Sequence, residues 1–193
     1  MAQIALFHSV LGVRPGVLDA ARRLTEAGHD VMVVDQYDGE VFDDYTDAMF
    51  FAEHIGFAEL FHRGARAASA LDDGFLTVGF SNGGCMAALL DAQRPAAGAV
   101  LLGGVISLAT LGGASWPQGV PAQVHTMTED PYREQAEIEA FAAEVAAAGA
   151  QAEVFDYPGS GHLFTDPSLA TEYDEEAGEL LWTRVLEFCA RVG

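Results

Sequence analysis

A serine, an aspartate and a histidine occur in this chain in the order and setting that nucleophilic catalysis needs. Ser81 lies in the pentapeptide Gly79–Gly83, which follows the apolar run Phe75–Val78. This pattern predicts a strand, a sharp turn and a helix, with the serine hydroxyl raised above the edge of a sheet. Because a serine hydroxyl is a weak nucleophile at neutral pH, it needs a base beside it. We therefore expect a nucleophile at Ser81 and look for its partners further along the chain.

The candidate base is His162, which follows the last strand-like segment in a glycine-flanked loop. The candidate acid is Asp130, which comes just after another apolar segment and before Pro131, a residue that fixes the backbone of the loop. A carboxylate here would hold the imidazole in the right tautomer and stabilise the imidazolium. Glu129 and Asp156 remain alternatives for the acid.

Ester chemistry also needs two donors for a developing oxyanion. The amide of Asn82 is one candidate, because it begins the helix after the turn. The amide of Val10, in the loop after the first strand, is the second. Ser9 and Arg14 in the same region, and Trp116 in a glycine-rich connection, are candidates for contacts with the substrate.

These residues must be positioned by strands that alternate with helices along the whole chain. Apolar runs predict strands over residues 4–7, 31–34, 75–80, 98–102, 122–127 and 152–157. Helical spacing of apolar residues predicts helices over 17–27, 47–70, 83–93, 133–148 and 175–191. The strands lack polar alternation, which is typical of a parallel sheet covered on both faces. We predict one doubly wound α/β domain over residues 1–193, with its site beyond the carboxyl ends of the strands.

Composition narrows the classes of partner. The chain has 29 Asp and Glu against 9 basic residues, all of them Arg, and a formal net charge of −20. Such a surface repels nucleic acid and anionic membranes, so the expected partner is a small molecule. Two cysteines without close spacing predict neither a disulfide framework nor a zinc site, and His54 and His62 match no zinc pattern. We expect no metal or organic cofactor.

No signal peptide or membrane-spanning run is apparent in the sequence, which makes a cytoplasmic location the expectation. Monomer and homodimer both remain open.

Three segments resemble the dienelactone hydrolase family of the α/β-hydrolase superfamily. They are the first strand and its loop, Leu6–Gly12 with Arg14 and Pro15, the turn Gly79–Gly84, and the histidine segment Gly161–Asp166. The resemblance implies the α/β-hydrolase fold and the chain order nucleophile, acid, histidine. About twenty residues separate the fourth and fifth predicted strands, too few for a helical lid domain, so we expect a shallow, open site.

The chain also departs from the family. The founding enzymes of the family carry a cysteine nucleophile where this chain has Ser81, a glutamate where it has Ser9, and an arginine that meets the substrate carboxylate where it has Asp166. A carboxylate-bearing dienelactone is therefore not the expected substrate, although Arg14 and Arg133 could lie near the mouth of the site. We expect Cys85 to pack against the sheet, away from the pocket.

Four further side chains, Phe50, Phe51, Phe57 and Phe61, are expected mainly in the core, with part of the cluster as a pocket wall in the less favoured interpretation. His125, inside a predicted strand, is expected to be a hydrogen-bonded core residue.

The leading hypothesis is a serine hydrolase of small carboxylic esters, lactones or thioesters that acts through an acyl-enzyme. The alternative is a catalytically silent domain of the same fold that binds a ligand or partner. Geometry separates the two: the enzyme hypothesis requires Ser81 near hydrogen-bonding distance of His162, with a carboxylate on the other ring nitrogen.

Overall fold

The computed structural model describes residues 1–112 and 114–193 and arranges them around one six-stranded sheet. The strands follow the order β2-β1-β3-β4-β5-β6, and every neighbouring pair is parallel. Their bounds are β1 Gln3–Phe7, β2 Asp30–Val34, β3 Phe75–Phe80, β4 Ala96–Leu102, β5 Ala122–Met127 and β6 Ala152–Tyr157. The predicted doubly wound parallel sheet is confirmed, and its order reverses between β1 and β3.

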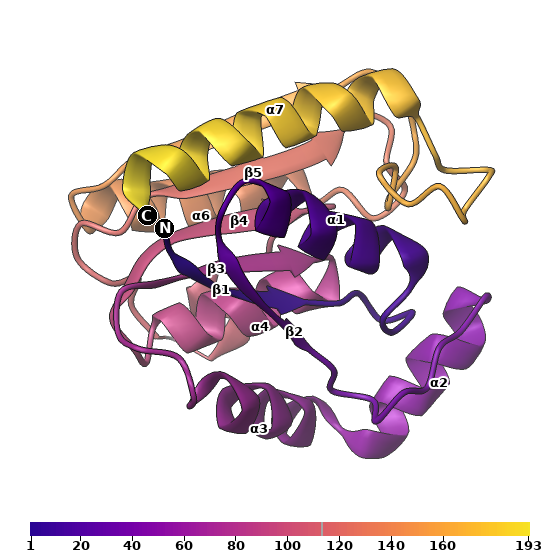
Figure 1. Cartoon of the computed structure of the whole chain (residues 1–193), viewed down its shortest axis with the longest axis horizontal. Coiled ribbons are helices and arrows are strands. Elements are labelled where there is room, and N and C mark those ends of the chain that lie inside the picture. The colour runs from indigo at the N-terminus through magenta and orange to yellow at the C-terminus, as the bar shows by residue number, and fades with distance from the viewer. Residues whose placement is uncertain (113) are drawn as a thin grey trace.

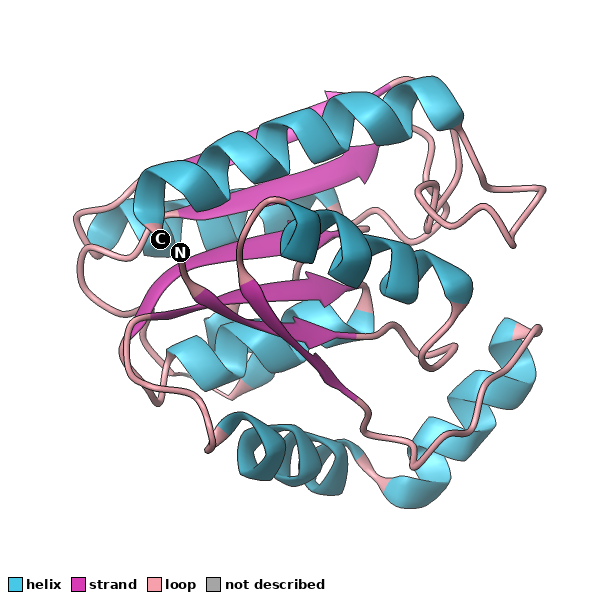
Figure 2. Cartoon of the chain, viewed as in Figure 1, coloured by secondary structure: helices cyan, strands magenta, loops and turns pink. Residues whose placement is uncertain are grey.

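Helices cover both faces of the sheet (Figure 1). Helices α1 (Pro15–Glu26) and α7 (Glu175–Val192) lie on one face, and α3 (Phe57–Ala68), α4 (Asn82–Asp91) and α6 (Gln135–Ala147) lie on the other. Helix α2 (Tyr45–Ile55) stands beyond the carboxyl ends of the strands, among the loops that Figure 2 shows on that side. Among the described residues, the connection from β4 to β5 holds the single helical turn α5 (Leu108–Leu111).

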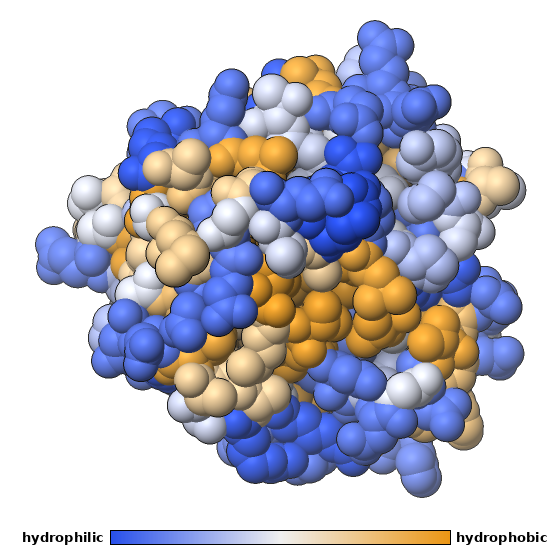
Figure 3. All heavy atoms as spheres, in the orientation of Figure 1, coloured by the Kyte–Doolittle hydropathy of each residue, from blue (hydrophilic) through white to orange (hydrophobic). Residues whose placement is uncertain are grey.

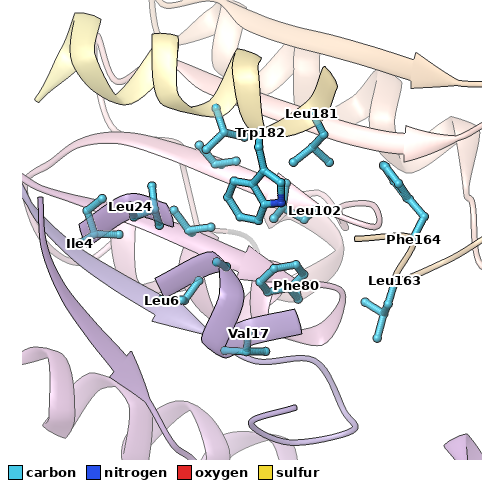
Figure 4. Close-up of a cluster of buried hydrophobic side chains, with 14 of the residues drawn as sticks. Ile4, Leu6, Val17, Leu24, Phe80, Leu102, Leu163, Phe164, Leu181 and Trp182 are labelled. Atoms are coloured by element: carbon cyan, nitrogen blue, oxygen red, sulfur yellow. The ribbon is translucent and has the colours of Figure 1, made fainter. Parts of the chain in front are cut away.

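Alternate side chains of the strands build the two halves of the core. In β1, Ile4 and Leu6 are fully buried and pack toward α1 and α7, where Trp182 joins the same cluster (Figure 4). Phe7 lies in the second cluster, together with Met86 of α4. Burying a side chain of this size stabilises the fold by about 1.5–3 kcal/mol. The sheet is therefore a rigid platform for the loops at its carboxyl edge.

The structure corrects the single long helix predicted over residues 47–70. Gly56 has φ 89°, outside the helical region, and it separates α2 from α3. Asp44 fixes the start of α2, because its carboxylate accepts the amide hydrogens of Thr46 and Asp47. The break turns α2 away from the face that α3 covers and places it over the end of the sheet.

Helix α7 contains 18 residues, which is long enough to approach the thickness of a bilayer. Its sequence is amphipathic, with Leu181, Val185 and Phe188 buried against the sheet. Of the helices in the described part of the chain, none is both long and apolar enough to cross a membrane.

A buried carboxyl group lies at the far end of α4 from the turn that carries Ser81. Asp91, the last residue of α4, is 1% exposed, and its Oδ2 accepts a 2.7 Å hydrogen bond from the Thr77 hydroxyl. Its Oδ1 has no hydrogen-bond partner in the described residues. Burial raises the pKa of this carboxyl well above its usual range, because the charged form loses its hydration.

We expect Asp91 to make folding stability fall as the pH rises. A folded-state pKa above the unfolded value gives stability that is complete below about pH 4 and is lost as the carboxyl ionises. In denaturant unfolding from about pH 4 to about pH 8, the wild type should lose at least about 1 kcal/mol relative to Asp91→Asn. The exposed control Asp72→Asn should follow the wild type, and identical pH profiles for wild type and Asp91→Asn would contradict the expectation.

Candidate active site

Ser81 lies in the sharp turn between β3 and α4. Its backbone has φ 51° and ψ −116°, a conformation that non-glycine residues rarely adopt. The Ser81 amide donates a 2.7 Å hydrogen bond to the carbonyl of Leu102 in β4, which holds the turn against the neighbouring strand. The predicted strand-turn-helix arrangement is present, with Ser81 at its apex.

Two glycines allow this turn to close. A Cβ atom at Gly79 would overlap the backbone of Gly83. A Cβ atom at Gly83 would lie 2.5 Å from the carbonyl oxygen of His8. Helix α4 therefore begins in direct contact with the end of β1, and this contact brings the loop after β1 beside Ser81.

His162 links Ser81 to Asp130. Its Nε2 lies 2.7 Å from the Ser81 Oγ, and its Nδ1 lies 2.8 Å from the Asp130 Oδ2. An ionised carboxylate can only accept hydrogen bonds, so Nδ1 carries the ring hydrogen and Nε2 accepts the serine hydroxyl hydrogen. The Asp130 side chain is fully buried, and its Oδ1 accepts the amide hydrogen of Tyr132 at 2.8 Å. This relay of hydrogen bonds can activate a hydroxyl nucleophile.

The alternative acids lie elsewhere. The Asp156 carboxylate forms a 2.8 Å ion pair with Arg133. Glu129 makes no hydrogen bond to His162 among the described contacts, although its amide donates to the carbonyl of Gly159. Of the three candidates, Asp130 is the one that the structure brings to the histidine.

The loop of His162 is held by Glu172, which the sequence prediction missed. The Glu172 carboxylate accepts the amide hydrogen of Leu163 at 2.7 Å and the hydroxyl hydrogen of Tyr45 at 3.0 Å. Burial, followed by the nearby Glu172 charge, raises the pKa of the Tyr45 hydroxyl, which therefore remains a donor. The ring of Tyr132 lies 4.7 Å from the imidazole, centroid to centroid. No local motif marks these residues, because their partners are distant in sequence.

The proposed oxyanion donors lie on the same side of the site. Val10 and Asn82 line one cleft with Ser81 and His162. Within the described residues, neither the Val10 amide nor the Asn82 amide donates to another protein group. Both are thus available to an oxygen atom bound beside Ser81.

His8 fixes the loop that carries Val10. Its Nδ1 lies 2.6 Å from the carbonyl oxygen of Ser9, and its Nε2 lies 3.0 Å from the amide nitrogen of Gln36. The carbonyl requires a donor and the amide requires an acceptor, so the ring is neutral with hydrogen on Nδ1. Burial lowers the pKa of His8, which agrees with a neutral ring.

A cleft of about 840 Å³ opens at Ser81, and α2 forms one of its walls. Met49 and Phe50 of α2 and Phe57 of α3 line it. Phe50 is 74% exposed and Phe57 43%, so the expectation that both are core residues is wrong. Phe51 packs against Tyr37 as a core residue would. The site is open, as expected, but it is not shallow, because α2 and α3 after the second strand add a wall to the one that follows the fourth strand.

The three side chains expected to contact substrate do not line this cleft. The Ser9 hydroxyl accepts the amide hydrogen of Leu11. Arg14 is buried and pairs with Asp43 at 2.7 Å and with Asp166 at 3.4 Å.

Trp116 lies in the core. Its indole N–H donates to the carbonyl of Val120 at 2.7 Å, and its ring packs edge-on against Phe141. In this arrangement Ser9, Arg14 and Trp116 make contacts within the protein and lie outside the cleft at Ser81.

Cys85 is buried, as expected, but it lines the cleft, so the prediction that it points away from the pocket is wrong. Burial raises the pKa of its thiol to about 11, which leaves the thiol protonated at neutral pH.

His125 is the hydrogen-bonded core histidine that the sequence predicted, with Nδ1 2.8 Å from the Tyr157 hydroxyl. Its pKa is lowered to about 3 by burial. Across the residues that the structure describes, no three His, Cys, Asp or Glu side chains gather in a way that could hold a metal ion.

A sequence model of the dienelactone hydrolase family matches residues 2–193, and the chain belongs to that family. No curated protein matches it.

Solved structures with a similar fold share little sequence with this chain. A dienelactone hydrolase-like promiscuous phosphotriesterase from metagenomic libraries is 19% identical with a TM-score of 0.81, and the match covers 100% of this chain and 87% of the other. A carboxylesterase of Bacillus cereus is 18% identical, with a TM-score of 0.59 and coverage of 100% and 89%. An alpha/beta hydrolase from a Medee basin deep-sea metagenome library is 16% identical, with a TM-score of 0.59 and coverage of 96% and 83%. The fold is that of the α/β-hydrolases, and family membership makes the protein an ester-hydrolysing enzyme.

Adjacent glycines of the turn provide a matched test of this geometry. Gly83→Ala should lower kcat for ester hydrolysis by at least about tenfold and destabilise the protein by about 1–3 kcal/mol, because its Cβ would displace the backbone at His8. A Cβ at Gly84 would meet its nearest atom, the Gly104 carbonyl oxygen, at 3.5 Å, an ordinary contact. Gly84→Ala should therefore behave like the wild type in turnover and thermal unfolding. Equal effects of the two substitutions would contradict the account of the turn.

Proposed function

We propose that the protein is a serine hydrolase of small carboxylic esters, lactones or thioesters, with Ser81 as nucleophile, His162 as general base and acid, and Asp130 as the orienting carboxylate. The observation that carries the proposal is the continuous relay from Ser81 Oγ through His162 to Asp130, at 2.7 and 2.8 Å, on the wall of an open cleft.

Acylation would begin when the Ser81 Oγ attacks the carbonyl carbon of the substrate and its proton passes to His162 Nε2. The negative charge that develops on the carbonyl oxygen would be met by the amides of Val10 and Asn82. The bond to the leaving alcohol or thiol then breaks, and His162 returns the proton to that group. For a lactone the leaving alcohol stays joined to the acyl group.

Deacylation would repeat the same steps with water. His162 takes a proton from the water as it attacks the acyl carbon, and the proton then passes to the Ser81 oxygen as the carboxylic acid leaves. The buried carboxylate of Asp130 stabilises the imidazolium in both halves of the reaction.

Ser81 rather than Cys85 is the proposed nucleophile, although the founding enzymes of the dienelactone hydrolase family use a cysteine. His162 Nε2 is hydrogen-bonded to Ser81, whereas the Cys85 thiol has a raised pKa of about 11 and is a poor nucleophile in that state. Both ring nitrogens of His162 have the partners that catalysis requires, Ser81 and Asp130, and this favours an enzyme over a catalytically silent binding domain.

Labelling with a fluorophosphonate probe tests the nucleophile. Ser81→Ala should abolish labelling and lower kcat for p-nitrophenyl butyrate by at least about 10³-fold. Cys85→Ala, four residues further along in α4, is the matched control and should keep both labelling and turnover. Labelling that survives Ser81→Ala, or disappears in Cys85→Ala, would contradict the assignment.

Substitution of each of the three candidate carboxylates tests which one orients His162. Asp130→Asn should lower kcat by about 10³–10⁴-fold, because an amide donor favours the wrong tautomer of His162. Asp156→Asn and Glu129→Gln should leave kcat within about threefold of the wild type. A greater loss in either control than in Asp130→Asn would move the acid role to that residue.

A further inference from the structure

The cleft is apolar on the wall that a substrate would meet beyond the reacting serine. Met49 and Phe50 project from α2, Phe57 begins α3, and Val105 and Ile106 follow β4. Met49 and Phe50 are at least half exposed, so this surface has no other part of the described chain packed over it. Figure 3 shows one face of the molecule, on which apolar atoms, in orange, gather in a patch that overlies β2 in the orientation of Figure 1. A hydrocarbon group in the cleft would therefore gain by leaving water.

The charged side chains that line the cleft are both acidic. Glu53 lies near the end of α2, and Glu134 lies at the start of α6. Both are exposed, and neither forms an ion pair with another described residue. Their charges are consequently not neutralised by the protein.

No arginine among the described residues lines the cleft, and the chain contains no lysine. The two arginines that could have met a substrate carboxylate are committed elsewhere. Arg14 is buried with Asp43 and Asp166, and Arg133 is paired with Asp156. An anionic group entering the cleft would meet two carboxylates and no cation.

We propose that this cleft selects uncharged and cationic esters with an apolar acyl chain and disfavours anionic ones, and that Glu53 and Glu134 set this preference. The inference rests on the proposed ester hydrolysis at Ser81 and names its substrate class. The carboxylates act at the mouth of the cleft, so they bias entry and binding rather than the bond-breaking step.

Three p-nitrophenyl esters that differ at the far end of the acyl chain test the preference. They are the pentanoate, the glutarate monoester and the 4-(trimethylammonio)butanoate. In wild-type kcat/KM, corrected for background with Ser81→Ala, the anionic ester should fall at least about tenfold below the neutral one, and the cationic ester should not. Raising the salt concentration to about 0.5 M should reduce the difference in kcat/KM between the anionic and neutral esters, because the carboxylates of Glu53 and Glu134 are exposed to solvent.

The double variant Glu53→Gln with Glu134→Gln should lower the ratio of kcat/KM for the neutral ester to kcat/KM for the anionic ester by at least about threefold. The control is Asp72→Asn with Glu187→Gln, which removes the same total charge at exposed positions that do not line the cleft. This control should leave the ratio of kcat/KM between the neutral and anionic esters as in the wild type. Equal rates for the three esters, or an equal effect of the two double variants, would overturn the inference.

Binding of the same esters to Ser81→Ala, followed by ligand-observed NMR, separates this inference from the proposed function. The ranking by charge should persist in this variant, because Glu53 and Glu134 are unchanged. If wild type turns over no ester while Ser81→Ala still ranks them, the proposed hydrolysis fails and the charge preference stands. If turnover depends on Ser81 but binding ignores charge, the preference fails and the hydrolysis stands.

Discussion

Ser81 has a left-handed backbone conformation, and the arrangement of the site depends on it. A strained residue of this kind costs about 1–3 kcal/mol and persists only where its surroundings hold it. The holding contacts are the Ser81 hydrogen bond to Leu102 and the close approaches permitted by Gly79 and Gly83. Because the turn is pressed against the end of β1, it fixes the direction of the hydroxyl and the position of the Val10 loop together.

The loops of the acid and the histidine reach this fixed point through polar contacts made behind the cleft. Glu172 joins Tyr45 of α2 to the loop of His162, and the buried pair of Arg14 and Asp166 joins the loop after β1 to the segment after the histidine. A buried ion pair adds little net stability, but breaking it is costly, so it favours one arrangement of the loops. Arg14, which could have met a substrate carboxylate, and Asp166, at the position of the family's substrate-binding arginine, thus pair with each other inside the protein.

Most of the sheet and the three residues of the relay could be predicted from the sequence. Apolar runs without alternation identify buried parallel strands, and the rule that loops after such strands meet at one edge brings Ser81, Asp130 and His162 together. These signals are local, and the chain order adds the pairing.

The walls of the cleft could not be predicted in the same way. Helical spacing around Phe50 and Phe57 gives an apolar face but not its partner, and the break at Gly56 decides that this face borders the cleft. Likewise, the directions of Arg14 and Trp116 depend on partners such as Asp166 and Phe141, far away in sequence. Charge, by contrast, could be read from composition, but its placement at Glu53 and Glu134 required the structure.

The most direct test of the central claim is to trap the acyl-enzyme. The wild type is mixed with p-nitrophenyl butyrate, quenched in acid during turnover and digested for peptide mass spectrometry. The account predicts a butyryl group on Ser81, in greater amount in the burst than after the substrate is exhausted. A butyryl group on Cys85, or turnover with an unmodified Ser81 at every time point, would contradict it.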